Sequence, residues 1–312
     1  MTPFFSVVIP LYNKEAFIEK TIKSVLNQDL QDFELIIVDD GSTDNSFKIV
    51  SNYKNSKIRI LKQLNQGVSV ARNNGIENSK GNYIALLDAD DLWSKNHLFE
   101  LKRQILFFPN AGLYCNNYEI FYSKSLTRPA NLNFRFNKEC LIVKDFFMAS
   151  ITQSVAWTSA VAFEKEKFKS VGSFNTSLKT AQDLDLWIKM ALKYPVSFNP
   201  CITMSYKLYV EESLSKNEYN DIRYEFINSY KEDEKNNSSL KVYLDVNRYA
   251  LAIRCLLNDE NQIYNKVKKE INYGNLNFKQ KLLINSPKFL LLIAKGLHNI
   301  LKKTGFYLSA YK

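Results

Sequence analysis

The stretch YIALLDADDLW, residues 83–93, decides the fold class of this chain. Its first five residues are a continuous apolar run, which is typical of a strand buried on both faces of a parallel sheet. The run ends abruptly on three carboxylates, Asp88, Asp90 and Asp91. Because these carboxylates repel one another and are costly to desolvate, we expect a cation to lie beside them.

An apolar strand followed by acidic residues also occurs earlier in the chain. Residues 34–38 form a second apolar run, and Asp39 and Asp40 follow it directly. The first hundred residues alternate expected strands and helices: strands at 5–10, 34–38, 58–61 and 83–87, helices at 15–27, 47–53 and 67–78. This β-α-β-α order predicts an α/β protein with a Rossmann-like, mostly parallel sheet flanked by helices. Since ligands bind at the carboxyl ends of parallel strands, the two acidic groups should converge.

Composition places the chain among folded globular proteins. Of its 312 residues, 46% are hydrophobic and 13% aromatic, which supports a large core and argues against disorder. The four cysteines are widely spaced and there are only two histidines, which argues against a disulfide framework and a zinc site. No apolar run of about 18 residues occurs, and the first strand begins near the N-terminus. We therefore expect no membrane span, no secretory signal and a cytoplasmic protein.

Charge is distributed unevenly along the chain. The net charge is +10, but residues 251–312 hold 11 Lys and Arg against 3 Asp and Glu, a net of +8. Beyond about residue 215 the pattern becomes helical, so we expect a helical, basic C-terminal extension over residues 215–312. The body is nearly neutral and its strand ends are acidic. A nucleic-acid partner is therefore not expected, because these carboxylates would repel a phosphate backbone.

The two acidic strand ends have a functional and a structural interpretation. Asp88 and Asp90 could hold Mg²⁺ or Mn²⁺ against a diphosphate, or they could lie in a solvated loop. Asp39 and Asp40 could contact a nucleotide base or its ribose, or they could belong to an ordinary turn. No G-x-G-x-x-G follows the first strand, so the dinucleotide-binding fingerprint is absent.

A third carboxylate group lies in QDLDLW, residues 182–187. Asp183 is at the start of a helical stretch, where the helix dipole keeps a carboxylate ionised and suits it to act as a general base. The structural alternative is that Asp183 or Asp185 caps the helix while Trp187 packs in the core.

Together these motifs resemble a known family. The segments SVVIPLYNKEAF, VDDGSTDNS, NQGVSVARNNG and YIALLDADDLW, within residues 5–93, closely resemble the family-2 glycosyltransferases of GT-A fold. The resemblance resumes at VGSFNTSLKTAQDLDLW, residues 171–187. It implies a GT-A domain over residues 1–214, with a nucleotide-sugar-binding half in residues 1–110 and an acceptor half in residues 111–214.

The resemblance also implies a role for each motif residue. The implied donor-nucleotide contacts are Pro10, Tyr12, Asn13, Asp39, Asp40, Arg72 and Asp88, with Asp40 against the base. The implied ligands of a Mn²⁺ or Mg²⁺ cofactor are Asp90, as the more direct one, and Asp88. Asp183 matches the catalytic base, and Gln182 and Trp157 are assigned to the acceptor side. Relatives often have Glu-Asp at Gln182-Asp183, so a negative charge is missing from the acceptor pocket, which puts the acceptor's identity in doubt.

The activity implied by the resemblance is inverting transfer of one sugar from a nucleotide-diphospho-sugar, expected to be a UDP-sugar, to an acceptor hydroxyl. The Gln-x-x-Arg-Trp signature of processive synthases is absent. The expected acceptor is a glycan or lipid-linked glycan in bacterial surface polysaccharide assembly. The alternatives are a catalytically silent sugar-nucleotide-binding or scaffold protein of the same fold, and a nucleotidyltransferase, although the Gly-rich loop usual in the latter is missing.

The segment SPKFLLLIAKGLHNILKKTGFY, residues 286–307, repeats apolar residues at helical spacing together with lysines. A basic amphipathic helix could lie on an anionic membrane surface, which would make the protein peripheral on the inner face of the cytoplasmic membrane. The same helix could instead dock on the catalytic domain or on a second subunit. The sequence leaves both open.

Overall fold

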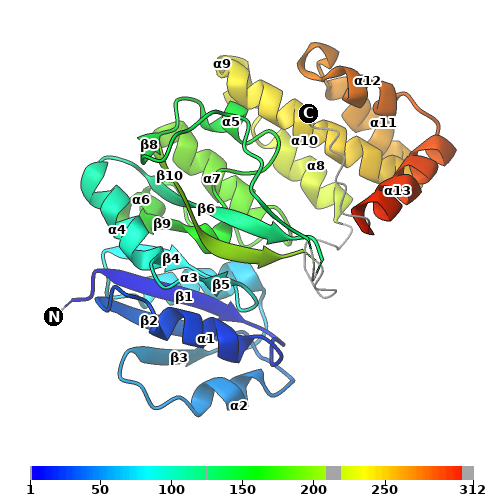
Figure 1. The fold of residues 1–312 in the computed structure, drawn as a ribbon. Helices are drawn as coiled ribbons and strands as arrows, with labels where there is room; N and C mark the ends of the chain where they lie inside the picture. Colours follow the sequence, from blue (N-terminus) through cyan, green and yellow to red (C-terminus); the bar gives the residue numbers. More distant parts are fainter. Residues whose placement is uncertain (1, 124–125, 209–218, 304–312) are drawn as a thin grey trace.

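The structure is a computed structural model that describes residues 2–123, 126–208 and 219–303, with side chains described up to residue 298. One ten-stranded sheet forms the centre of the molecule, and helices from the last part of the chain pack beyond one side of it (Figure 1). The predicted α/β class with a C-terminal helical extension is confirmed. The expected boundary between residues 214 and 215 lies outside the described residues.

The amino-terminal part of the sheet is parallel, as predicted. β1 (Phe5–Leu11) lies between β2 (Phe33–Asp39) and β4 (Tyr83–Leu86), and β3 (Ile58–Lys62) lies beyond β2. β1 and β2 are buried along almost their whole length, because helices cover both faces of this part of the sheet, and this burial explains their apolar runs. The connecting helices are α1 (Ile18–Leu26), α2 (Ser46–Ser51) and α3 (Val68–Glu77).

Gly75 allows α3 to pack closely on this sheet. A Cβ atom added at Gly75 would lie 2.5 Å from Cγ1 of Val8 on β1 and 3.1 Å from Cγ2 of Val38 on β2. A larger residue would therefore push the helix away from the strands. The close approach matters for function because Arg72, one turn earlier on α3, contacts Asp88 beyond the end of β4.

After β4 the sheet becomes mixed. β9 (Val161–Glu164) lies antiparallel between β4 and β6 (Leu113–Phe121), and β10 (Val196–Lys207) runs parallel to β6. The remaining short strands are β5 (Leu92–Trp93) and β8 (Leu141–Ile142), which pair with β10, and β7 (Thr127–Pro129), which pairs with β6. The helices of this part are α4 (His97–Phe107), α5 (Phe146–Ala149), η1 (Thr158–Ala160), α6 (Lys165–Ser170) and α7 (Gln182–Lys193).

The C-terminal helices are organised around one long central helix, α10 (Ser238–Leu257). Around it lie α8 (Asn220–Asn228), α9 (Lys231–Asn236), α11 (Asn261–Glu270), η3 (Tyr273–Asn275), α12 (Phe278–Ile284) and α13 (Lys288–Lys303) (Figure 1). An ionic cluster centred on α10 links it to its neighbours: the fully buried Asp245 accepts from Asn275 Nδ2 of η3 at 2.8 Å, and Arg248 Nη1 donates to Glu234 of α9 at 2.8 Å. Within α10, Asp245 also accepts from Lys241 Nζ at 2.6 Å and from Arg248 Nη1 at 3.1 Å. The extension is therefore a packed helical unit with polar contacts of its own.

Candidate functional site at the carboxyl ends of the strands

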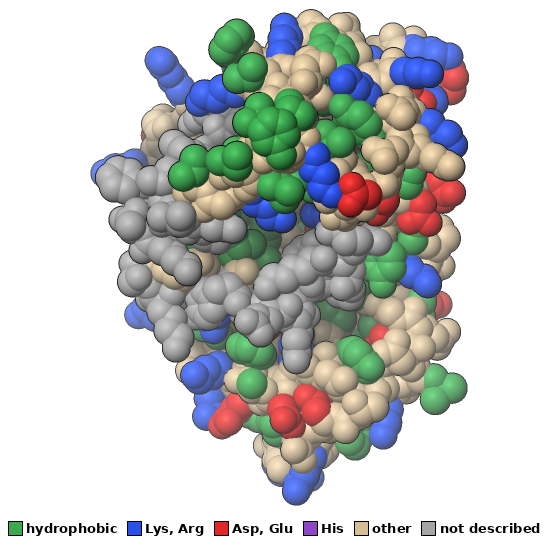
Figure 2. Space-filling model, turned by 90° about the vertical axis from the view of Figure 1, so that its right-hand side faces the viewer, with side chains coloured by type: hydrophobic (Ala, Val, Ile, Leu, Met, Phe, Trp, Pro, Cys, Tyr) green, Lys and Arg blue, Asp and Glu red, His purple; other side chains and the backbone are tan. Residues whose placement is uncertain are grey.

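The two acidic groups predicted to converge lie at the same edge of the sheet, on either side of β1. The Asp40 backbone N–H donates to Leu11 O at 2.8 Å, and the Leu87 N–H donates to Val8 O at 3.1 Å. Figure 2 views the molecule from the side to which these strand ends point, where the surface is hollowed between its upper and lower parts. The arrangement places a candidate ligand site at the edge that strand-end geometry favours.

Asp39 and Asp40 are both buried, but their carboxylates differ in what they contact. Asp40 accepts from Gln63 Nε2 at 2.8 Å and from the backbone N–H groups of Gln66 and Gly67, each at 2.9 Å. Asp39 accepts only from Ser42 N–H, at 3.3 Å, and its Oδ2 atom has no partner among the described residues. Asp40 thus holds the 63–67 loop, whereas Asp39 keeps an oxygen that can accept from a ligand.

The loop after β1 is held beside these carboxylates by Asn13. Asn13 has a left-handed backbone (φ 50°), and its Oδ1 atom accepts from the Thr43 N–H at 2.8 Å. Tyr12, whose side chain is 45% exposed, is therefore fixed at the rim of the site. Pro10 lies within β1 opposite Val38, so it supports this loop from the strand.

Asp88 is paired with a buried cation. Arg72 Nη2 donates to Asp88 Oδ1 at 2.6 Å, and the guanidinium lies 5.3 Å from the centre of the Phe174 ring. The other two guanidinium nitrogens of Arg72 are buried and have no hydrogen-bond partner among the described residues. Because a buried donor without a partner is costly, this side chain is suited to receive an anionic ligand.

Asp90 is also paired, with a residue that the sequence motifs did not indicate. Lys14 Nζ lies 2.9 Å from Asp90 Oδ2, and both side chains are mostly buried. Beneath this pair, Asp91 is buried; its burial, followed by the charges of Asp88 and Asp90, raises the pKa of its carboxyl well above the usual value. In the structure, the cations beside Asp88 and Asp90 are Arg72 and Lys14, and a divalent metal ion at this turn stays a prediction.

The carboxylates at this turn fit a hard divalent cation. Mg²⁺ and Mn²⁺ bind proteins through one or two carboxylates and complete their shells with waters and phosphate oxygens. Asp88 and Asp90 supply two carboxylates, and their side chains remain 34% and 21% exposed. Within the described ranges, no three His, Cys, Asp or Glu side chains form a metal-binding group. A divalent cation held by Asp88 and Asp90 alone would have to take its remaining ligands from water or from a bound diphosphate.

Asp183 lies in the first turn of α7 and is linked to Asp88 through η1. Thr158 Oγ1 donates to Asp183 Oδ2 at 3.4 Å, and the neighbouring Ser159 Oγ accepts from the Asp88 N–H at 3.0 Å. The charge of Asp183 also contributes, after burial, to the raised pKa of Tyr243 on α10. Thr158 and Ser159 carry no signal in the sequence, since neither periodicity nor charge marks them.

The two acceptor-side residues lie on either side of this link. Gln182 is buried next to Asp183, and its Oε1 atom has no partner in the part of the chain that the structure describes. Trp157 directly precedes η1 and packs between Tyr118 and Tyr206, with ring centres 4.9 and 4.7 Å away. Both therefore lie close in sequence to the groups that connect Asp88 with Asp183.

Comparisons with known proteins show which family the chain is similar to. The family model described as glycosyl transferase family 2 matches residues 6–172. EpsJ of Bacillus subtilis (strain 168), an uncharacterised glycosyltransferase, is 45% identical over 93 residues, which cover 29% of this chain and 27% of EpsJ. TuaG of the same strain carries the provisional name of teichuronic acid biosynthesis glycosyltransferase; it is 31% identical over 223 residues, 70% of this chain and 83% of TuaG.

A solved structure shares the fold. S. aureus TarS, residues 1–349, in complex with UDP-GlcNAc superposes with a TM-score of 0.66 at 18% identity, over 86% of this chain and 83% of that one. This similarity confirms the expected GT-A fold. The matching model covers more than half of the chain, and the similarity to TuaG extends through the segment that contains Asp183. The chain therefore belongs to glycosyl transferase family 2.

Proposed function

We propose that the protein is an inverting, metal-dependent glycosyltransferase that moves a single sugar from a nucleotide-diphospho-sugar, a UDP-sugar, to an acceptor hydroxyl. The observation that carries the proposal is the short Thr158–Ser159 connection. It joins Asp88, on the expected donor side, to Asp183, the expected base, by two hydrogen bonds. An acid–base residue and a cluster for a charged leaving group are therefore adjacent.

The donor would bind across the carboxyl ends of β1, β2 and β4. The resemblance implies that Asp40 contacts the base, but its carboxylate already accepts three hydrogen bonds. We therefore assign that contact to the free oxygen of Asp39, which is suited to accept an N–H of the base, and Tyr12 can cover one face of the ring. Arg72, with two nitrogens to spare, can donate to a phosphate or ribose oxygen. A divalent cation on Asp90 and Asp88 would supply positive charge for the departing diphosphate.

Asp183 would act on the acceptor. Its carboxylate takes the proton from the attacking hydroxyl while that oxygen forms a bond to the anomeric carbon. The bond from this carbon to the diphosphate breaks on the opposite face, so the anomeric configuration inverts. Thr158 orients the carboxylate by donating to Oδ2, and the Leu184 N–H holds Oδ1 at 2.9 Å.

The proposed acceptor is a glycan or lipid-linked glycan of a bacterial surface polysaccharide. The name of TuaG, a relative assigned to teichuronic acid biosynthesis, supports this choice of acceptor. The UDP-GlcNAc bound to TarS supports the proposed UDP-sugar donor instead. The buried, neutral Gln182 beside Asp183 presents an amide where related chains often carry a charge, so it favours an acceptor with a group that donates a hydrogen bond to Oε1.

The donor site can be tested by calorimetry. We expect wild-type protein to bind UDP only with Mn²⁺ or Mg²⁺, and Asp90→Asn to lose that metal-dependent binding. GDP and dTDP are the controls for the base. Absence of binding to any of the three nucleotides with either metal would overturn the proposal. Binding without hydrolysis or transfer of any sugar would favour a silent sugar-nucleotide-binding protein.

We also propose that the C-terminal helices bring the protein to an anionic membrane surface on the cytoplasmic side. α13 is held on the protein through the buried Leu291, while apolar side chains on its outer faces are 45–61% exposed: Phe289, Leu290, Leu292, Ile293 and Leu297. Lys295 is exposed among them, and the whole segment is basic. None of the described helices is long and apolar enough to cross a bilayer. Such a basic amphipathic surface suits the interface of an anionic bilayer.

Deletion of residues 286–312 should release the protein from vesicles that contain phosphatidylglycerol, with no effect on pure phosphatidylcholine. Retention of the truncated protein on anionic vesicles would contradict the membrane proposal. A dimer that dissociates on truncation would instead identify the surface as a subunit contact.

A further inference from the structure

Lys14 is a charged residue of the site to which no motif assigns a role. Lys14 follows Asn13 in the loop between β1 and α1, and its backbone N–H and carbonyl are both hydrogen-bonded. The N–H donates to Ser46 Oγ at 2.7 Å. The carbonyl accepts from the N–H groups of Phe17 and Ile18, each at 2.9 Å. The backbone therefore cannot follow a ligand, and any adjustment must come from the flexible side chain.

The ammonium group of Lys14 occupies one of the two carboxylates proposed to bind the cation. Its Nζ atom is 2.9 Å from Asp90 Oδ2, and the side chains of Lys14 and Asp90 are 17% and 21% exposed. A divalent ion on Asp90 would repel an ammonium group at this distance, and Mg²⁺ or Mn²⁺ would compete with it for the same oxygen. Metal binding therefore requires Lys14 to move.

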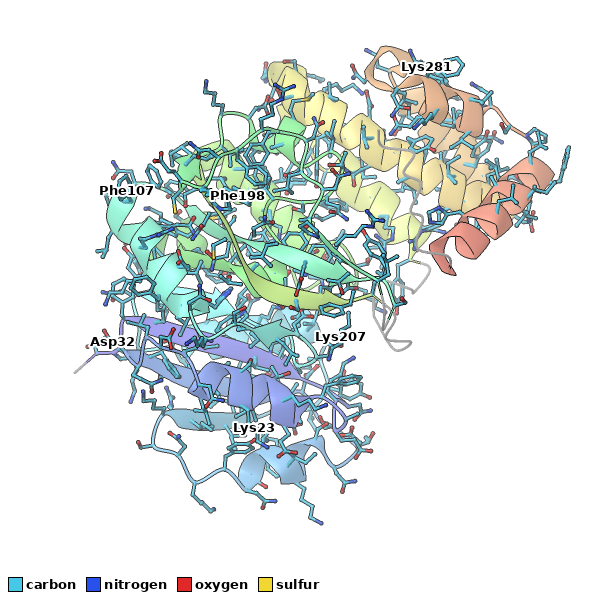
Figure 3. The ribbon with its side chains drawn as sticks, viewed as in Figure 1. Lys23, Asp32, Phe107, Phe198, Lys207 and Lys281 are labelled. Atoms are coloured by element: carbon cyan, nitrogen blue, oxygen red, sulfur yellow. The ribbon has the colours of Figure 1, made fainter. Side chains whose placement is uncertain are left out.

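A second lysine, Lys207, lies near the side chain of Lys14. Lys14 Nζ lies 5.9 Å from the centre of the Phe17 ring, and Lys207 Nζ lies 5.7 Å from the same ring. Lys207 ends β10 and is seen in Figure 3 at the side of the molecule where the strands end. The ammonium groups of Lys14 and Lys207 thus lie near the same aromatic ring, so two positive charges are available to a diphosphate bound at this edge of the sheet.

We propose that Lys14 is an exchangeable counter-ion: it neutralises Asp90 when no metal is bound and passes to the diphosphate oxygens of the donor when the cation takes its place. The proposal rests on the proposed function, because it needs a donor with a diphosphate. It makes metal and nucleotide binding cooperative, since a cation alone must displace Lys14 without giving it a new partner. Lys14 is thereby a positioning residue for the charge of the leaving group.

The test measures binding of Mn²⁺ by electron paramagnetic resonance and of UDP by calorimetry, for wild type, Lys14→Met and Lys14→Arg. Lys14→Met should bind Mn²⁺ alone about tenfold more tightly and UDP with Mn²⁺ about tenfold more weakly, because one positive charge is lost from a partly buried site. Lys14→Arg should restore both values towards wild type. Lys23→Met, which removes an exposed lysine paired with Glu19 on α1, is the matched control and should change neither.

Each outcome of these measurements supports or overturns one part of the proposal. Unchanged affinity of Lys14→Met for Mn²⁺ alone would overturn the counter-ion role, even if the wild type binds UDP normally. Failure of the wild type to bind any nucleotide would overturn the proposed function and the transfer of Lys14 to a diphosphate. The Mn²⁺ measurement would still show whether Lys14 and the metal ion compete for Asp90. A melting temperature close to wild type in all variants confirms that folded proteins are compared.

Discussion

Two clusters of charged residues in this molecule are built from the same groups but differ in what they leave open. On α10, both carboxylate oxygens of the fully buried Asp245 accept hydrogen bonds. Its Oδ1 atom accepts from Lys241 and Arg248. Its Oδ2 atom accepts from Asn275 Nδ2 at 2.8 Å and from the Asn272 N–H at 3.3 Å. At the strand ends, Asp88 and Asp90 each have one cation and remain partly exposed. The closed cluster can stabilise the fold, whereas the open one has capacity for a ligand.

The same contrast occurs within one helix, two residues apart. Asp185 is buried, forms an ion pair with Lys189 at 2.6 Å and accepts from Tyr230 Oη at 2.6 Å, so it ties α7 to the C-terminal helices. Asp183 is only partly buried, and among the residues that the structure describes Thr158 is the one whose side chain donates to it, at 3.4 Å. Of the two carboxylates in QDLDLW, only Asp183 is therefore open to an acceptor.

The largest expected effect comes from Asp183→Asn, which removes the base but keeps its shape. Turnover should fall by about 10²–10⁴, the usual contribution of general-base catalysis, with UDP affinity nearly unchanged. Asp185→Asn is the matched control: it should lower stability and leave most turnover per folded molecule. Single-turnover transfer with purified variants would measure both. Equal turnover of Asp183→Asn and wild type would remove Asp183 from the mechanism.

A smaller effect is expected from opening the closed cluster with Arg248→Met. The variant leaves Asp245 and Glu234, which Arg248 contacts at 3.1 and 2.8 Å, without their buried guanidinium partner. Loss of one member of a buried ion pair should lower the free energy of unfolding by about 3–5 kcal/mol, measured by urea denaturation. UDP affinity of the folded protein should not change. A stability equal to wild type would show that this cluster is not closed to solvent as described.

The smallest effect is expected from Tyr230→Phe, which removes one hydrogen bond from Asp185 and keeps the ion pair with Lys189. Burial, followed by the charge of Asp185, raises the pKa of Tyr230, so the phenol remains a donor throughout the useful pH range. The loss should be about 1–2 kcal/mol in the free energy of unfolding. Tyr224→Phe, which removes a more exposed bond to Glu270 at 3.0 Å, is the control and should cost less. The reverse order would contradict the assignment of Tyr230 as the buried link.

Local sequence patterns predicted the secondary-structure elements of the amino-terminal part and the edge of the sheet at which the site lies. The apolar runs before Asp39 and Asp88 predicted β2 and β4, and the parallel arrangement of both beside β1 followed from the alternation of strands and helices. These features are local, because burial on both faces and helix periodicity are written in consecutive residues. The mixed part of the sheet was not predicted, since an antiparallel insertion such as β9 leaves no distinct local pattern.

Contacts between distant parts of the chain determine which carboxylates have partners and which can still accept a hydrogen bond from a ligand. The contacts of Asp40 with Gln63 and Gln66, of Asp183 with Thr158 and of Asp185 with Tyr230 come from partners more than twenty residues away. The same holds for the pairing of Lys14 with Asp90 and of Ser159 with Asp88. Strand order brings these partners together, and a hydrogen bond or ion pair forms only where the folded chain places donor and acceptor within about 3 Å.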